Sequence, residues 1–153
     1  AAVVSLLWLR HQPGTGRETV IWIVACVIAA DTGAYFLGSL AGGMKLAPSI
    51  SPSKTWSGLI GGMCWAAVVS ALLGLVFHLG ETLSLALIGA VLAVVEQLGD
   101  LLESAAKRRA GVKDSGRLIP GHGGLLDRVD GLIAILVVVG LVRLLTGGDW
   151  PWG

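Results

Sequence analysis

Charged residues are scarce in this sequence. Asp, Glu, Lys and Arg make up 14% of the 153 residues, whereas an average soluble domain carries about a quarter. Hydrophobic residues make up 54%, and a soluble protein of this size needs more polar surface than the remainder can supply. The shortage of charge therefore excludes an ordinary soluble domain and predicts a membrane protein.

Cysteine is also rare. Cys26 and Cys64 are the only two, and both lie inside apolar runs. No Cys-x-x-Cys pair and no Cys/His spacing typical of a metal site occurs. We therefore expect two buried free thiols rather than a disulfide or a metal-binding pair.

Four apolar stretches are long enough, or nearly long enough, to cross a bilayer, which takes about 20 helical residues. They are residues 19–40, 55–79, 82–105 and 129–145. Helices are expected because lipid offers backbone groups no water, and the stretches are too long and too unalternating for barrel strands. The predicted fold class is all-α, a polytopic transmembrane helix bundle with polar loops. Residues 1–9 are too short to span and are interpreted as the tail of a helix whose beginning is missing.

The cations are distributed unevenly between the two sides of this predicted bundle. Because successive helices alternate in direction, the loops at 41–54 and 107–128 share one side. They hold eight of the eleven Lys and Arg residues, and the positive-inside rule places such loops in the cytoplasm, where nucleoside triphosphates are available. The eight are Lys45, Lys54, Lys107, Arg108, Arg109, Lys113, Arg117 and Arg128.

Residues 104–130 combine six cations, three carboxylates, one histidine and five glycines in an otherwise apolar chain. Binding a polyphosphate together with a divalent cation is a function that fits this density of charge. The glycines around His122 let the backbone approach a ligand, and their N–H groups can cradle an anion. His122 itself is either a structural hydrogen-bonding residue or a contact to phosphate or base.

Carboxylates gather at two predicted helix ends. Glu96, Asp100 and Glu103 are spaced four and three apart, so they share one helix face, where a cation among them or protonation of one would relieve their repulsion. A solvated helix end explains Glu103 but not Glu96. Asp127 and Asp130 begin the following helix on one face, and N-terminal capping accounts for Asp127 alone. Mg²⁺ binds one or two carboxylates plus substrate phosphates, so we expect it between these helix ends.

Two further features concern the membrane boundary. An ionised Asp31 in the middle of the first span costs roughly 2.5–3.5 kcal/mol, so we expect it to line a polar cavity or to bond a neighbouring helix. The loop before Trp56 has two prolines, three serines and Lys54. It suits an anionic lipid headgroup or a phosphate, and a generic anchor at the membrane interface is the equal alternative.

These residues resemble a known family. The pattern Ser104-x-x-Lys107-Arg108, Lys113-Asp114 and Pro120-x-His122-Gly123-Gly124-x-x-Asp127-Arg128-x-Asp130 is similar to the signature of the phosphatidate cytidylyltransferases, also called CDP-diacylglycerol synthases. Residues 31–35, 45–48, 51–56 and 99–104 resemble further blocks of that family, so the resemblance covers residues 30–132. Ser57 departs from it where an acidic residue is expected, and Ala106 where a larger apolar one is.

The resemblance implies transfer of CMP from CTP to phosphatidic acid, giving CDP-diacylglycerol and pyrophosphate. It implies one membrane-embedded catalytic domain over residues 1–153, corresponding to the C-terminal half of a protein with further N-terminal transmembrane helices. The expected location is the inner or plasma membrane with the catalytic loops in the cytoplasm. Mg²⁺ is the implied cofactor, with K⁺ allowed as a second cation. The partners are CTP, phosphatidic acid and the bilayer, a homodimer is allowed, and no nucleic acid is expected.

Roles for individual residues follow from this resemblance. Asp100 and Asp127 are expected to hold the metal, with Asp130 and Glu103 as further ligands. Phosphate clamping is expected from Lys107, Arg108, Lys113 and Arg128, and further substrate contacts from His122, Gly123 and Gly124. Ser51, Ser53 and Lys54 are expected to hold the phosphatidate head, and Asp31 to line the cavity that meets the bilayer.

Three other functions remain open from the residues alone. A related CTP-dependent enzyme could act on a polyprenol or dolichol. Acidic residues within membrane helices also mark ion paths, so a transporter or channel fragment is a second alternative. A non-catalytic scaffold or truncated pseudoenzyme is the third.

Overall fold

The computed structural model describes residues 1–112 and 129–146, which form five helices and one two-stranded sheet. The order along the chain is α1 (Ala2–Arg10), α2 (Gly16–Ala41), β1 (Lys45–Ala47), β2 (Ser51–Thr55), α3 (Trp56–Phe77), α4 (Thr82–Arg109) and α5 (Asp130–Leu145). The predicted all-α bundle is confirmed for these residues.

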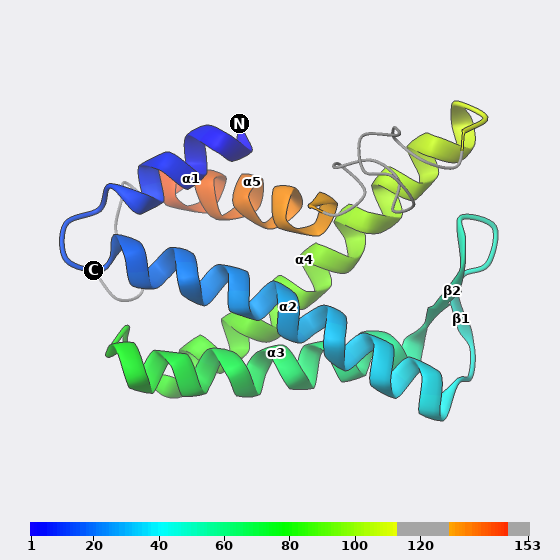
Figure 1. The fold of residues 1–153 in the computed structure, drawn as a ribbon, viewed down its shortest axis with the longest axis horizontal. Helices are drawn as coiled ribbons and strands as arrows, with labels where there is room; N and C mark the ends of the chain where they lie inside the picture. Colours follow the sequence, from blue (N-terminus) through cyan, green and yellow to red (C-terminus); the bar gives the residue numbers. More distant parts are fainter. Residues whose placement is uncertain (113–128, 147–153) are drawn as a thin grey trace, which may run out of the picture.

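Helices α2 and α3 lie side by side and antiparallel (Figure 1). Small residues let their backbones touch: a Cβ on Gly33 would lie 2.5 Å from the carbonyl oxygen of Gly61 and 2.6 Å from Cβ of Trp65. Without water as a driving force, such close packing is what holds membrane helices together. The small residues of α3 thus serve close packing of the helices.

The long helix α4 crosses behind this pair, and α5 pairs with α1 on its other side (Figure 1). A buried polar contact ties three helices together, because Nε1 of Trp22 on α2 donates to Ser70 on α3, whose hydroxyl donates to the carbonyl of Leu85 on α4. The apolar core gathers residues from all five helices or their ends, among them Leu9, Trp22, Leu92 and Ile135.

Three helices, α2, α3 and α4, are long and apolar enough to cross a membrane. In the most hydrophobic window of each, no more than 33% of the residues are buried inside the protein. The rest of that apolar surface faces outward, as it does in a helix surrounded by lipid. The 129–145 stretch is helical as predicted, but α5 has 16 residues and is not among the three. The structure thus supports three spans where we expected four.

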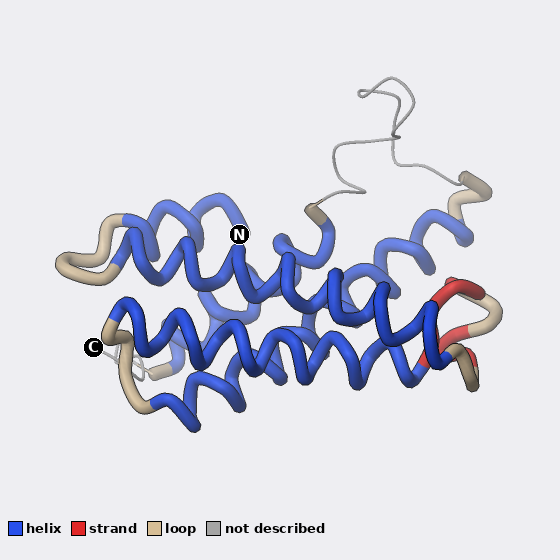
Figure 2. Tube along the Cα trace, turned by 60° about the horizontal axis from the view of Figure 1, so that its bottom comes forward, coloured by secondary structure: helices blue, strands red, loops and turns tan. Residues whose placement is uncertain are grey.

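The loop before Trp56 contains a β-hairpin that the sequence analysis did not predict (Figure 2). Lys45 pairs with Thr55 and Ala47 with Ser51, and a bulge lies between the two pairs. Pro52 is tolerated because both strands of a two-stranded sheet are edges. Serines and prolines give the segment no alternating apolar pattern, so its strands carry no signal in the sequence.

The hairpin and the C-terminal end of α4 lie at one end of the bundle, opposite the short α3–α4 connection (Figure 1). The expectation that the 41–54 and 107–128 loops share one side is therefore confirmed for residues 107–112, while 113–128 lie outside the described residues.

Candidate cation and phosphate site

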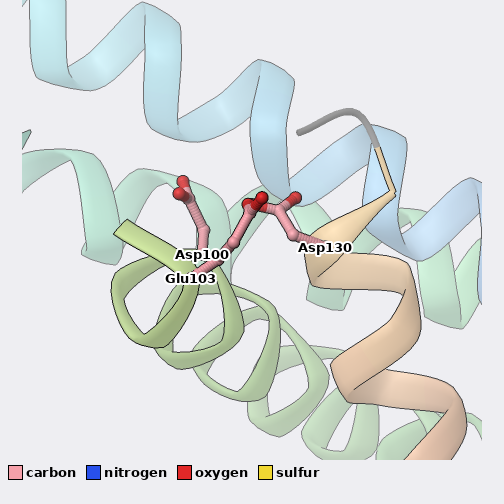
Figure 3. A group of neighbouring side chains, drawn as sticks. All are labelled: Asp100, Glu103 and Asp130. Carbon is pink, nitrogen blue, oxygen red and sulfur yellow. The ribbon is translucent and has the colours of Figure 1, made fainter. Parts of the chain in front are cut away.

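Three carboxylates from two helices come together where α4 meets the start of α5 (Figure 3). Asp100 and Glu103 belong to the last turns of α4, and Asp130 is the first residue of α5. Each offers one oxygen, and these oxygens all lie within 4.8 Å of one another. All three were expected beside a shared cation, and the structure brings them together.

Close packing between α4 and α5 creates this approach. A Cβ on Gly99 would collide with Cβ of Ala134 on α5, and a Cβ on Gly131 would lie 2.6 Å from Cγ of Glu96 on α4. Glycine at both positions lets the two backbones converge where their acidic residues lie. Neither glycine was recognised for this role, although Gly99 stands directly before Asp100.

Two of the three carboxylates, those of Asp100 and Glu103, already have cations or a hydroxyl beside them. Asp100 accepts from the hydroxyl of Ser104 at 3.4 Å with one oxygen and forms an ion pair with Lys54 through the other. Glu103 pairs with Lys107 one turn later, at 3.6 Å, and both side chains are largely buried. These cations offset the mutual repulsion of the carboxylates.

Asp130 has a local role as well. Its Oδ1 accepts from the backbone N–H of Gly131 at 2.8 Å, and a carboxylate at a helix start is stabilised by the macrodipole. One oxygen of its carboxylate also belongs to the group shared with Asp100 and Glu103 (Figure 3).

A polar cavity of about 330 Å³ opens beside this cluster. Its walls come from α2, the end of the hairpin, the start of α3 and the middle of α4. The lining residues include Asp31, Tyr35, Ser53, Lys54, Gln97 and Asp100. Asp31 therefore lines a polar cavity, as one of its two readings expected. Gln97 and Tyr35 were not predicted, because an isolated Gln or Tyr within a span carries no pattern.

Local structure holds Lys54 at this cavity. Lys54 is the last residue but one of β2. The strand ends at Thr55, whose hydroxyl caps α3 by accepting from the N–H of Gly58 at 3.1 Å. Ser57, the residue that departs from the family pattern, bonds the Thr55 hydroxyl at 3.0 Å and donates to the carbonyl of Gly42. The hairpin is thus fastened at its base, and the Lys54 side chain is only 14% exposed.

Glu96 lies apart from the cluster, although it shares the stripe of Asp100 and Glu103. It is 5% exposed and lies against Gly131 of α5. Its carboxyl group lies close to that of Asp31 across the α2–α4 contact. The acidic stripe of α4 therefore has two parts: Glu96 is buried, and Asp100 and Glu103 belong to the cluster at the helix end.

The remaining predicted site residues fall into two groups. Ser51 bonds the Ser53 hydroxyl at 3.5 Å but does not line the cavity, and Arg108 is exposed at the end of α4. Asp127, Arg128, Lys113, His122, Gly123 and Gly124 lie outside the described residues. The expected pairing of Asp100 with Asp127 thus stays a prediction.

The donor set suits a hard divalent ion. All three groups are carboxylates, the oxygen ligands that Mg²⁺ prefers together with phosphates and water. An octahedral ion with bonds of about 2.1 Å accepts ligand oxygens up to about 4.2 Å apart, close to the spread of the cluster. The arrangement can neutralise a polyphosphate through such an ion and hold a second phosphate with Lys54.

Fold and site together define a class: a membrane-embedded helical bundle with a carboxylate cluster and a polar cavity at one end of its spans. The chain belongs to the cytidylyltransferase family, whose model matches residues 1–145. The resemblance seen in the motifs is thereby confirmed.

Several curated relatives are similar over most of the chain. A phosphatidate cytidylyltransferase of Brucella suis is 45% identical over 133 residues, 87% of this chain and 49% of the relative. One of Haemophilus influenzae is 42% identical over 144 residues, 86% of this chain and 49% of the relative. One of Mycobacterium tuberculosis is 40% identical over 134 residues, which are 87% of this chain and 40% of the relative. The chain spans about half the length of the curated relatives it matches, or somewhat less.

Proposed function

We propose that this chain carries the catalytic centre of a phosphatidate cytidylyltransferase, which transfers CMP from CTP to phosphatidic acid and releases pyrophosphate. The observation that carries the proposal is the convergence of Asp100, Glu103 and Asp130 beside a cavity that contains Lys54. A cation site next to a polar cavity of about 330 Å³, at the end of the spans, suits a reaction between a nucleotide and a lipid. The names of the relatives point to the same reaction.

Catalysis of this reaction depends mainly on positioning the two substrates and neutralising their negative charges. An oxygen of the phosphatidate phosphate attacks the α-phosphorus of CTP, the bond from that phosphorus to the β-phosphate bridging oxygen breaks, and pyrophosphate leaves. The attacking group is already an anion, so no strong base is needed. The obstacle is the approach of two polyanions, which cations and oriented donors relieve.

Each part of the site has a task in this reaction. Asp100, Glu103 and Asp130 hold Mg²⁺, with Asp127 as a further ligand and K⁺ as an allowed second cation, and the ion supplies positive charge for the CTP phosphates. Lys107 and Arg108, with Lys113 and Arg128, bind triphosphate oxygens. His122, Gly123 and Gly124 contact the nucleotide from the same loop.

The cavity side receives the lipid. Lys54 and Ser53 bind the phosphate of phosphatidic acid, with Ser51 next to them on the hairpin, while Asp31 forms the wall. The acyl chains remain in the bilayer along the apolar outer faces of α2 and α3. We place this end of the bundle on the cytoplasmic side of the membrane, where CTP is available, because the predicted loops there carry most of the cations. A homodimer is compatible with this arrangement.

The direct test is release of pyrophosphate from CTP by the intact protein in mixed micelles containing phosphatidic acid. We expect turnover that requires both phosphatidic acid and Mg²⁺ and is lost on chelation. Asp100→Asn and Asp130→Asn should each lower kcat/KM by about 100-fold or more, in line with the loss of a group that acts on transition-state charge. Glu18→Gln, at the opposite end of α2, is the matched control and should behave as wild type.

The same assay separates the alternatives. Turnover with a polyprenol or dolichol acceptor but not with phosphatidic acid would assign the chain to another CTP-dependent enzyme. Cation flux into liposomes without CTP would support a transporter. Full activity of Asp100→Asn would refute the metal assignment.

A further inference from the structure

Glu96 belongs to the acidic stripe of α4 but has no part in the proposed reaction. It lies one turn before Asp100, within a helix long and apolar enough to span the membrane. Its side chain is almost fully enclosed, with 5% of the residue exposed. A buried carboxyl group is costly unless its surroundings satisfy it, so its neighbours indicate what it does.

One of these neighbours is the start of α5. A Cβ on Gly131 would lie 2.6 Å from Cγ of Glu96 and 2.9 Å from its Oε1. The side chain of Glu96 therefore lies flat against the first turn of α5, directly beside Asp130. Any change in the volume of Glu96 alters the distance at which that turn packs on α4.

A second neighbour is Asp31 on α2. The two carboxyl groups lie close to each other, and Asp31 lines the cavity that also contains Lys54. Glu96 thus touches the wall of the cavity on one side and the helix that carries Asp130 on the other.

We propose that Glu96 is a positioning residue, and this inference rests on the proposed function. It fixes the first turn of α5, and with it Asp130, at the distance from Asp100 that a shared cation requires. Through Asp31 it also fixes the cavity wall, so that the distance between the cation site and the phosphate cavity stays constant. Residues that orient metal ligands from outside commonly contribute this way.

The test is binding of Mn²⁺, used as the probe in place of Mg²⁺, to the intact protein in detergent without substrates, followed by electron paramagnetic resonance. Glu96→Ala should weaken Mn²⁺ binding by about ten-fold or more, the effect typical of losing an orienting neighbour. Glu96→Gln keeps the shape and supplies an N–H donor to Asp31, so it should restore binding to within about three-fold of wild type.

Two further variants separate positioning from general damage. Leu92→Ala is the matched control, because Leu92 is 4% exposed and lies one turn earlier on α4; it should lower the midpoint of thermal unfolding and leave Mn²⁺ affinity unchanged. Gly131→Ala keeps the Glu96 carboxyl but forces α5 away from it, so it should weaken Mn²⁺ binding as Glu96→Ala does. If Glu96→Ala does not fold, Gly131→Ala decides the question alone.

The inference is overturned if folded Glu96→Ala, or Gly131→Ala in its place, binds Mn²⁺ as tightly as wild type. It is also overturned if Leu92→Ala weakens binding as much as they do. With activity as a second readout, the supporting result is a joint rise in the Mg²⁺ concentration for half-maximal activity and in the KM for phosphatidic acid. Should the wild-type protein bind Mn²⁺ yet never transfer CMP, the proposed function fails while the Mn²⁺ comparison still tests Glu96.

Discussion

At the scale of single residues, the ion pair between Lys54 and Asp100 joins the two halves of the site. The Lys54 side chain is 14% exposed and that of Asp100 33% exposed, so water screens the pair only in part. Lys54 lies in the cavity wall, while Asp100 belongs to both the wall and the carboxylate cluster. One ammonium group is thus within reach of both a lipid phosphate and a cation ligand.

Removal of this ammonium group gives a prediction at the same scale. Lys54→Met keeps the length of the side chain but loses its charge, so the KM for phosphatidic acid should rise by about ten-fold, the cost of one charge-assisted hydrogen bond. The KM for CTP should change much less, because Lys107 and Arg108 lie on another element. Steady-state kinetics with each substrate varied in turn gives both constants.

Lys45→Met provides the control for this measurement, since Lys45 is exposed on the same hairpin and does not line the cavity. It should leave both constants unchanged. An equal rise of both KM values in Lys54→Met would reassign the hairpin to the nucleotide.

At the scale of helices, packing through small residues decides where the functional groups lie. The contact of α2 with α3 at Gly33 and Gly61 holds the cavity wall, and the contact of α4 with α5 at Gly99 and Gly131 holds the carboxylate cluster. In both pairs the backbones approach as closely as glycine permits, so one added methyl group has no space.

The α2–α3 contact can be tested by adding that methyl group. Gly33→Ala should destabilise the protein by about 1–3 kcal/mol, the usual cost of overpacking, because the new Cβ would lie 2.5 Å from the Gly61 carbonyl oxygen. The measurement is the midpoint of thermal unfolding in detergent. Val68→Ile, which adds one carbon at a position 54% exposed on the outer face of α3, should leave the midpoint unchanged. A wild-type midpoint for Gly33→Ala would show that these helices are not packed as described.

At the scale of the whole molecule, the three long helices divide the connections between two ends. The hairpin and the end of α4 lie at one end, and the connection at residues 78–81 lies at the other (Figure 1). Because α2, α3 and α4 have the length and hydropathy of membrane spans, we expect these two ends on opposite sides of a bilayer.

This arrangement predicts the pattern of cysteine labelling in whole cells. In a background carrying Cys26→Ala and Cys64→Ala, we expect Glu81→Cys to react with a membrane-impermeant thiol reagent from outside. Ser49→Cys, in the turn of the hairpin, should react only after the membrane is opened, because the positive-inside rule places that end in the cytoplasm. The reverse pattern would contradict the proposed orientation, and labelling of both positions from the same side would contradict the arrangement of the spans.

Some elements of the chain could be predicted from its sequence and others could not. The positions of α2, α3, α4 and α5 could be predicted, because the length of an apolar run is a local property. The hairpin could not, because its pairing joins Lys45 to Thr55 without any apolar alternation. The bounds of α5 were predicted to within one residue, but its 16 residues are fewer than the roughly 20 that a span needs.

What the sequence by itself determined is the membrane class, the helices and the acidic stripe on α4, since hydrophobic length and the helical repeat act within one segment. The family signature added the expected chemistry to the same residues. Only the tertiary structure decided that Asp130 approaches Asp100, that Lys54 reaches Asp100, and that Glu96 is enclosed between α2 and α5. Each of these depends on how closely two helices or a hairpin pack, and that distance arises from contacts between residues far apart in the chain.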